Sequence, residues 1–280
     1  RPITLLNADY KILMRVLTAR LNKAAVQFVS RQQNGFVPGG FIVENIMLLQ
    51  MLQAFAEEEN IEALFVFLDM EKAYDRVSWD YLIKAIKALG YPDGADGTEH
   101  AFVRWVRLAY SHDHPPTRRM HVNGYLSGSF TLESGVAQGC PASPLFFLFI
   151  TEAFIRLIMA DSRINGIEVD GARHKLSMYA DDATLLASPG DIPYFNEHNA
   201  TYCGATGGRE NASKREALLI GALARSPERA PRGVVSGDAY AAAGEPIRAL
   251  GYPIGHNFDV NEWWEGRYAV VKGRVAAWRS

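Results

Sequence analysis

The stretch Ala63-Leu64-Phe65-Val66-Phe67-Leu68-Asp69 indicates the fold of this chain most directly. Its six consecutive apolar residues are typical of a short strand that is buried on both faces of a sheet. The run ends in Asp69, so the sequence predicts a carboxylate at the end of a buried strand. Taken alone, Asp69 could equally be the N-cap of a following helix.

A second acidic feature is the pair Asp181-Asp182, which lies at or near a turn between two strand-like segments. Two neighbouring carboxylates repel each other unless one takes up a proton or both meet a cation. Aspartate oxygens suit hard ions such as Mg²⁺, which keeps several waters and recruits substrate phosphates. A polar turn without metal is nevertheless the commoner role of an isolated Asp-Asp dipeptide, so the pair needs support from other residues.

Apolar periodicity and turn signals predict the other elements. Helices are expected at residues 9–28, 44–59, 78–89, 101–110, 141–159 and 191–208, and further strands at 118–122, 129–133, 166–169, 175–178, 183–187, 217–220 and 248–252. Asn123-Gly124 predicts the turn between strands 118–122 and 129–133, and Asp170-Gly171 predicts the turn of a hairpin between 166–169 and 175–178. Residues 224–244 are rich in Ala, Gly, Pro and Arg and are poorly specified. Helices mixed with short antiparallel strands favour an α+β fold over a doubly wound sheet.

The composition restricts the class of protein. The 280 residues are 48% hydrophobic and 21% charged, which is enough apolar material for a core. A net charge of −2 and a pI of about 6.4 are unusual for a nucleic-acid enzyme, so its basic residues are either locally segregated or lie mostly outside this chain. Cys140 and Cys203 are too few for a disulfide framework or a four-cysteine zinc site. The longest apolar stretch, 144–150, is short, so we expect no membrane span or membrane partner.

Several blocks of this sequence resemble, in order, the motifs of reverse transcriptases. The first block resembles motif A and reads Phe67-Leu68-Asp69-Met70-Glu71-Lys72-Ala73-Tyr74-Asp75-Arg76-Val77. The second resembles motif B and reads Gly135-Val136-Ala137-Gln138-Gly139-Cys140-Pro141-Ala142-Ser143-Pro144. The third resembles motif C and reads Tyr179-Ala180-Asp181-Asp182. Residues 1–7 and 33–39 resemble early fingers blocks, 211–217 motif D, and 250–255 a strand near the primer grip. The blocks cover roughly residues 1–255 and are most similar to those of LINE-type, non-LTR retrotransposons.

The resemblance implies a right-hand polymerase with fingers and palm, in which an antiparallel palm sheet packs on helices and the thumb is truncated. Residues 1–62 would form the fingers and 63–255 the palm, with a fingers insertion around 90–135. Residues 256–280 would begin the thumb. The chain begins at Arg1 and stops within a helical pattern, so we expect a piece of a longer protein that also carries an endonuclease and the rest of the thumb.

The implied activity is that of an RNA-directed DNA polymerase, a nucleotidyltransferase that adds dNTPs to a DNA primer on an RNA template. Two Mg²⁺ ions about 4 Å apart, with Mn²⁺ as an alternative, would activate the primer 3′-hydroxyl and stabilise the leaving pyrophosphate. By resemblance, Asp69 and Asp181 would ligate both ions, Asp182 would lie beside them, and the Met70 carbonyl would be a further ligand. Such an enzyme would act inside the cell, in the nucleus.

The resemblance also implies roles for residues around the metals. Tyr74 would be the steric gate that excludes a ribonucleotide 2′-hydroxyl, although it could also be a core aromatic. Lys214 would be a general acid for pyrophosphate, or else an ordinary surface lysine. The remaining residues implied are Arg1 at the incoming triphosphate, Gln138 and Gly139 at the nucleotide pocket and template base, and Tyr179 near the primer terminus.

Three residues depart from the family pattern. Relatives commonly have Arg at the positions of Gly40 and Ala137, and Leu at that of Ala142. The two missing basic groups leave open that this is a decayed transposon remnant that at most binds nucleic acid. A palm-type RNA-dependent RNA polymerase is another alternative, but Tyr74 argues against it because a bulky gate excludes ribonucleotides.

Overall fold

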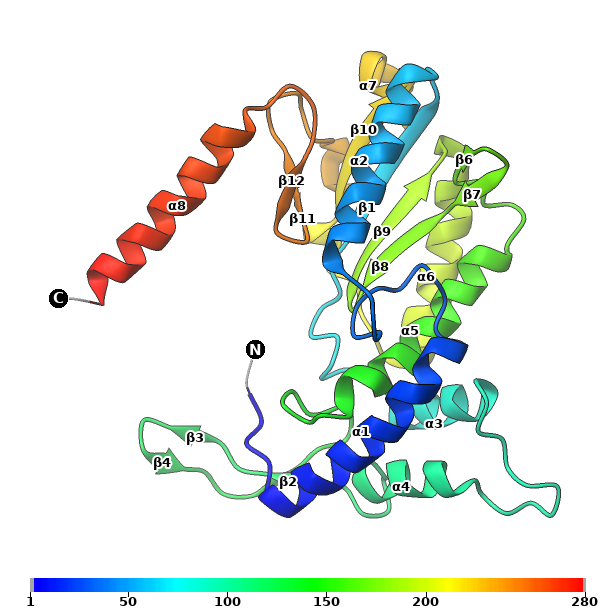
Figure 1. Ribbon diagram of the computed structural model, residues 1–280, viewed down its shortest axis with the longest axis vertical. Helices are drawn as coiled ribbons and strands as arrows, with labels where there is room; N and C mark the ends of the chain where they lie inside the picture. The colour runs from blue at the N-terminus through cyan, green and yellow to red at the C-terminus, as the bar shows by residue number, and fades with distance from the viewer. Residues whose placement is uncertain (1–2, 279–280) are drawn as a thin grey trace.

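A four-stranded antiparallel sheet lies at the centre of the computed structural model, which describes residues 3–278 (Figure 1). The strand order is β10-β1-β9-β8, and each neighbouring pair is antiparallel. The strands are β1 (Glu62–Leu68), β8 (Leu176–Tyr179), β9 (Asp182–Ala187) and β10 (Glu216–Gly221). The predicted α+β class and the antiparallel palm sheet are therefore confirmed.

Strand β1 is apolar on both faces because helices cover both sides of the sheet. Leu64, Val66 and Leu68 belong to the larger core, which includes residues of α1 (Ala8–Phe28), α3 (Trp79–Ala88), α5 (Ser143–Ala160) and α6 (Ile192–Thr206). Ala63 and Phe65 point the other way, into a smaller core with α2 (Ile42–Glu58). Successive strand residues alternate between faces, so a continuous apolar run is what a doubly covered strand requires.

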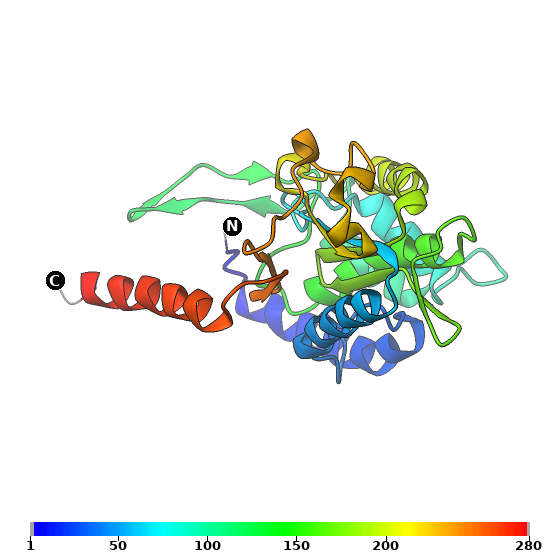
Figure 2. The same ribbon diagram turned by 90° about the horizontal axis from the view of Figure 1, so that it is seen from above.

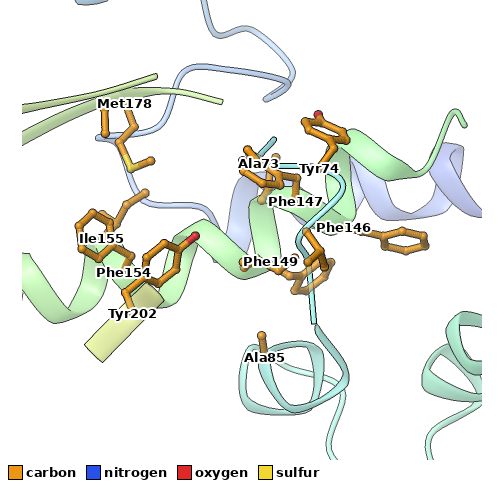
Figure 3. Close-up of a cluster of buried hydrophobic side chains, with 14 of the residues drawn as sticks. Ala73, Tyr74, Ala85, Phe146, Phe147, Phe149, Phe154, Ile155, Met178 and Tyr202 are labelled. Carbon is orange, nitrogen blue, oxygen red and sulfur yellow. The ribbon is translucent and has the colours of Figure 1, made fainter. Parts of the chain in front are cut away.

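Helix α5 forms the middle of the larger core. Figure 3 shows its aromatic residues Phe146, Phe147, Phe149 and Phe154 gathered with side chains from other elements. Among the described helices, α5 alone has the length and apolar composition of a membrane span, and 67% of it is buried inside the fold. It is longer and more apolar than the short stretch expected from the sequence, and its burial is that of a core helix.

Helix boundaries agree closely with the sequence patterns. Ser78, the first residue of the helix expected at 78–89, caps α3, and its Oγ accepts a hydrogen bond from the Tyr81 N–H at 3.3 Å. The other helices are α4 (Ala101–Ala109), the short α7 (Ala222–Arg225) and α8 (Val260–Ala277). Most of residues 224–244 is irregular, with short 3₁₀ turns at Pro227–Arg229 and Ser236–Asp238. The fingers, palm and thumb boundaries stay predictions, although α1 and α2 both pack directly on palm elements.

The small strands differ from the predicted ones in three places. Residues 118–122 and 129–133 form a ribbon of two separate ladders, β2 (Thr117–Arg118) with β5 (Phe130–Thr131) and β3 (His121–Val122) with β4 (Tyr125–Leu126). The register shifts by one residue between the two ladders, and there the Ser127 hydroxyl accepts the hydrogen bond of the Met120 N–H. The predicted turn at Asn123-Gly124 is confirmed, with positive φ at both residues.

The prediction that residues 166–169 pair with 175–178 is wrong. Strand β6 (Ile167–Val169) pairs with β7 (Ala172–His174) through the expected Asp170-Gly171 turn, and β8 pairs with β9 instead. The single strand predicted at 248–252 is also wrong, because β11 (Ile247–Ala249) and β12 (Tyr252–Ile254) form a hairpin. Its turn residues Leu250 and Gly251 both have positive φ, and a leucine gives no turn signal in the sequence.

Two elements project from the body of the molecule. The ribbon of β3 and β4 and the helix α8 extend toward the same side in both views (Figures 1 and 2). Helix α8 has no buried residue, whereas the sheet and its covering helices enclose both cores. The carboxyl end of β1 and the turn between β8 and β9 lie at the end of the sheet nearer this projecting ribbon (Figure 1).

Candidate active site

Asp69 and Asp182 lie side by side because the strands that carry them are adjacent. Leu68 pairs with Ala183 in the β1–β9 ladder, so one further step of the antiparallel register places Asp69 opposite Asp182. Side chains directly opposite each other in an antiparallel pair share one face of the sheet. Leu68 and Ala183 are buried in the larger core, so Asp69 and Asp182 are carried on the opposite face.

The chain after Asp69 is held by the segment that precedes Lys214. The Asp69 carbonyl accepts a hydrogen bond from the Asn211 N–H at 2.8 Å, and the Glu71 N–H donates to the Arg209 carbonyl at 2.8 Å. Glu210 is anchored in turn by Arg215, whose guanidinium donates to both of its carboxylate oxygens at 2.5 and 2.7 Å. This pairing fixes the turn that carries Lys214 against the carboxyl end of β1.

Lys214 forms an ion pair with Asp69, with Nζ 3.4 Å from Oδ2. The lysine side chain is 64% exposed and that of Asp69 is 37% exposed, so water screens the attraction. An exposed ion pair of this kind is held weakly, which leaves the ammonium group free to exchange Asp69 for another anion.

Asp69, Asp182 and Lys214 line one cavity of about 420 Å³ at the end of the sheet. Its polar lining comes from β1, β9, the Lys214 turn and the β11–β12 hairpin: Asp69, Asp182, Thr184, Ser213, Lys214, Glu216 and Arg248. Carboxylates beside cationic side chains can bind a divalent cation together with the phosphates of a nucleotide. Arg248 was not among the residues singled out in the sequence. Its only signal there was a basic residue shortly before the block that resembles the primer grip.

Asp181 lies on the turn between Tyr179 and Asp182, which pair with each other at the ends of β8 and β9. It borders a second, largely apolar cavity together with Met70, on the side of the sheet where α5 and α6 pack. The structure therefore brings Asp69 and Asp182 together in the first cavity and places Asp181 at the edge of the second. Within residues 3–278, no three His, Cys, Asp or Glu side chains are grouped to hold a metal ion.

The side chains that line the first cavity have the oxygen ligands that a divalent cation requires. Asp69 and Asp182 supply carboxylate oxygens, which are the ligands that hard cations prefer. A cationic group already lies beside Asp69, since the Lys214 ammonium is within ion-pair distance of its Oδ2. The contribution of Asp181 and of the Met70 carbonyl to metal binding stays a prediction.

Tyr74 is buried, with 8% of its surface exposed, and stacks on Phe147 of α5. The two ring centroids are 4.9 Å apart and the ring planes are 9° from parallel (Figure 3). The tyrosine thus has the core packing that was weighed as an alternative to the steric gate. The gate role stays a prediction.

Gln138 and Gly139 lie beside the N-terminal segment. The Gln138 carbonyl accepts a hydrogen bond from the Thr4 N–H at 2.8 Å, and the Gln138 side-chain nitrogen is buried without a hydrogen-bond partner in the described structure. Gly139 has φ +104°, and a Cβ there would lie 2.9 Å from the Thr4 carbonyl oxygen. Close backbone approach therefore requires glycine at this position. Arg1, expected at the triphosphate, lies outside the described residues.

Tyr179 ends β8 immediately before the turn that carries Asp181, and its predicted place near the primer terminus is untested. The sequence reasoning missed two residues that hold this turn, Gln33 and Asn45. Both are 2% exposed and hydrogen-bonded to β8 or to the turn. Polar residues between apolar ones were the available signal, since buried amides require partners.

The departures from the family pattern have a packing explanation. A Cβ at Gly40 would lie 2.4 Å from the Asn34 carbonyl oxygen, so no larger residue fits without movement of the loop. Ala137 and Ala142 are buried, with 6% and 0% of their surfaces exposed. An arginine at position 137 would bury a charge in this core, which is costly without a partner.

An antiparallel sheet covered by helices, with paired carboxylates at its end, is the arrangement of the fingers and palm of a polymerase. The model of the family described as reverse transcriptase (RNA-dependent DNA polymerase) matches residues 1–252. The chain belongs to this family, and its relatives make it a LINE-type, non-LTR reverse transcriptase domain.

Named relatives come from transposable elements. The transposon TX1 uncharacterized 149 kDa protein of Xenopus laevis is 32% identical over 80% of this chain and 16% of its own length. The probable RNA-directed DNA polymerase from transposon BS of Drosophila melanogaster is 31% identical over 67% of the chain and 19% of its own length. The retrovirus-related Pol polyprotein of the type-2 retrotransposable element R2DM from the same organism is 26% identical over 67% of the chain and 16% of its own length. The chain thus spans less than a fifth of these relatives.

Solved structures support the fold. Apo telomerase from Candida tropicalis superposes with a TM-score of 0.55 at 14% identity, covering 89% of this chain and 40% of the telomerase. Telomerase from the same organism in complex with a TWJ fragment of telomeric RNA gives a TM-score of 0.53 at 13% identity, and the match covers 90% of this chain and 36% of the telomerase. At these identities the likeness concerns the fold alone.

Proposed function

We propose that this chain catalyses RNA-directed DNA synthesis, adding dNTPs to the 3′-hydroxyl of a DNA primer paired with an RNA template. The observation that supports this most is the cavity at the end of the sheet, where Asp69 and Asp182 lie with Lys214 within 3.4 Å of Asp69. Family membership supports the reaction class and the dependence on divalent metal ions. The template, primer, dNTPs and nuclear action are parts of the same proposal.

The carboxylates of Asp69, Asp181 and Asp182 would hold two Mg²⁺ ions, or Mn²⁺, and the Met70 carbonyl would add an oxygen. Bound there, such ions would make the primer hydroxyl a stronger nucleophile and neutralise the charge of the transferring phosphoryl group. Because Asp69 and Asp182 are fixed on paired strands, their positions are set before substrate binds. The strands therefore supply the positioning on which phosphoryl transfer depends.

Lys214 would act at the leaving group. During addition the primer 3′-hydroxyl would lose its proton to solvent as a bond forms between O3′ and the α-phosphorus, and the bond from this phosphorus to the bridging oxygen of pyrophosphate would break. The exposed Lys214 ammonium, which contacts Asp69 at 3.4 Å, would donate a proton to the pyrophosphate oxygen. Tyr74, Gln138 and Gly139 would shape the pocket for the sugar and base of the dNTP.

Primer extension on poly(rA)/oligo(dT) with Mg²⁺ or Mn²⁺ tests the function. Asp181→Asn and Asp182→Asn, each made separately, should lower the rate of nucleotide addition by at least about 10²–10³-fold, because a charge that stabilises the transition state is removed. Both variants should keep nearly the same thermal unfolding midpoint as the wild type.

Asp170→Asn is the matched control, because it makes the same chemical change at an exposed turn in the β6–β7 hairpin. It should leave the rate unchanged. Undiminished extension by both active-site variants would refute the assignment. Binding of template–primer by the wild type without any synthesis would instead identify a remnant that only binds nucleic acid.

A further inference from the structure

The turn Ala180-Asp181 carries the acidic pair and has an unusual backbone. Ala180 has φ +57°, a left-handed conformation that residues other than glycine adopt at a cost. Tyr179 and Asp182 pair on either side, so the turn has only two residues and little freedom to distribute strain. Such a conformation persists where surrounding contacts enforce it.

Gln33 supplies those contacts from a distant part of the sequence. Its side-chain Oε1 accepts the Ala180 N–H at 2.8 Å, and its Nε2 donates to the Ala180 carbonyl at 3.2 Å. The same Oε1 accepts the Gly35 N–H at 2.8 Å, so two donors fix which end of the amide faces the turn. Gln33 is 2% exposed, and water therefore does not compete for these bonds.

The loop around Gln33 is held against β8 by further bonds. The Met178 N–H donates to the Gln32 carbonyl at 2.7 Å, and the Asn34 N–H donates to the Met178 carbonyl at 3.1 Å. Asn45 of α2 donates to the same Met178 carbonyl at 3.0 Å. The approach is so close that a Cβ at Gly35 would lie 2.2 Å from the Ala180 nitrogen.

We propose that Gln33 is a positioning residue for catalysis, because its amide clamps both main-chain polar groups of Ala180 and so fixes where Asp181 and Asp182 point relative to Asp69. This inference rests on the proposed metal-binding role of these aspartates. Gln33 makes no contact with the reacting atoms; it acts through the turn. Loss of the clamp frees Ala180 to leave the left-handed region, and the carboxylates turn with it.

Gln33→Met tests the clamp, since methionine keeps nearly the same length and lacks the hydrogen-bonding groups. We expect kcat for dNTP addition to fall by about 10²-fold, as displacement by about 1 Å can cause, with a smaller change in KM. Mn²⁺ affinity, measured by electron paramagnetic resonance without substrate, should fall by about 10–100-fold, the usual effect of losing a residue that orients metal ligands. Hydrogen exchange at the Ala180 amide should accelerate.

Gln33→Glu is the conservative variant. Burial favours its protonated form, which can accept the same two N–H bonds and donate to the Ala180 carbonyl. It should recover most of the Mn²⁺ affinity and of kcat. Asp191→Asn controls for stability loss alone, because this buried carboxylate accepts main-chain hydrogen bonds from Asn165, Gly166 and Ser188 beyond the other end of β9. That control should keep wild-type Mn²⁺ binding.

Unchanged Ala180 exchange and Mn²⁺ affinity in Gln33→Met would overturn the proposal. An equal loss of Mn²⁺ affinity in Asp191→Asn would also overturn it, by showing a general effect of instability. A wild-type chain that neither binds Mn²⁺ nor extends a primer would instead refute the proposed function, and the exchange rate of Ala180 would still report on the clamp.

Discussion

At the scale of single residues, the site combines buried or strand-borne groups with an exposed lysine. Asp69 and Asp182 are fixed by the register of β1 and β9, whereas Lys214 is mostly exposed and contacts Asp69 at 3.4 Å. Tyr74 is fixed in a different way, by stacking on Phe147. A fixed acidic pair beside an exposed, weakly held ammonium group suits a reaction in which Lys214 donates a proton to the leaving group.

Lys214→Ala separates catalysis from stability. Exposed ion pairs contribute about 0–1 kcal/mol, so the free energy of unfolding should change by less than about 1 kcal/mol. If Lys214 donates the proton to pyrophosphate, the rate of nucleotide addition should fall by about 10²-fold or more. Urea unfolding and single-turnover primer extension measure the two effects, and a rate equal to that of the wild type would contradict the proposed role.

Substitutions of Tyr74 can distinguish its proposed role as steric gate from its role in core packing. Tyr74→Phe keeps the stacked ring and should retain both stability and discrimination against rNTPs. Tyr74→Ala removes a ring that is 8% exposed and should cost about 3–5 kcal/mol of unfolding free energy, as large-to-small core changes do. Incorporation of dNTPs and rNTPs is compared at a temperature where the variant stays folded. Unchanged sugar selectivity in Tyr74→Ala would assign the residue to the core alone.

At the scale of elements, backbone contact joins the segments that carry motifs A and B. The Gly135 N–H donates to the Val77 carbonyl at 2.8 Å, and the Trp79 side chain donates to the Gly135 carbonyl at 2.8 Å. Gly135 has φ +91°, and a Cβ there would lie 2.7 Å from the Asp75 carbonyl oxygen. The start of α3 is therefore locked to the loop that leads into α5.

Gly135→Ala should break this junction. Its positive φ and the clash with the Asp75 backbone predict a loss of about 1–3 kcal/mol in the free energy of unfolding, or more if the loop cannot move. Gly128→Ala is the matched control, since no atom of the described residues outside its own chain neighbours lies within 4 Å of its Cβ position. Denaturant unfolding of both variants measures the difference. Equal stability of the two would show that the junction yields without cost.

At the scale of the whole molecule, ion pairs connect separate elements. One concentrated group joins the end of α5 to α6, where Asp161 accepts hydrogen bonds from Arg163 and lies 2.6 Å from His198 Nε2. The Arg163 guanidinium, together with the Arg163 main-chain N–H and His198, holds the pKa of the Asp161 carboxyl well below its usual range. This group couples stability to pH.

The sign of that coupling follows from the lowered pKa in the folded state. In the unfolded chain Asp161 has an ordinary pKa near 3.9, so its stabilising contribution is present above about pH 4 and is lost as pH falls toward the lower folded value. Asp161→Asn should therefore flatten the acid side of the unfolding curve and leave a stability deficit at neutral pH. Thermal melts between pH 3 and 7 measure this. An acid limb as steep as that of the wild type would contradict it.

Local patterns in the sequence were sufficient for most elements. The apolar run of β1, the start of α3 at Ser78 and the Asn123-Gly124 turn are confirmed because each depends on residues close together in the chain. The failures came where pairing depends on distant segments or on an atypical turn. Residues 175–178 do not pair with 166–169, although the expected turn near Asp181-Asp182 joins β8 to β9, and Leu250-Gly251 forms a turn inside an expected strand.

The sequence by itself determined the chemistry: which residues carry carboxylates, which strand ends in Asp69, and the order of the motifs. Only the tertiary structure decided which carboxylates share a cavity, because the β1–β9 register brings together positions far apart in the chain. It also decided what holds them. Gln33 reaches Ala180 across 147 positions of sequence through a buried amide, a contact that no local periodicity encodes.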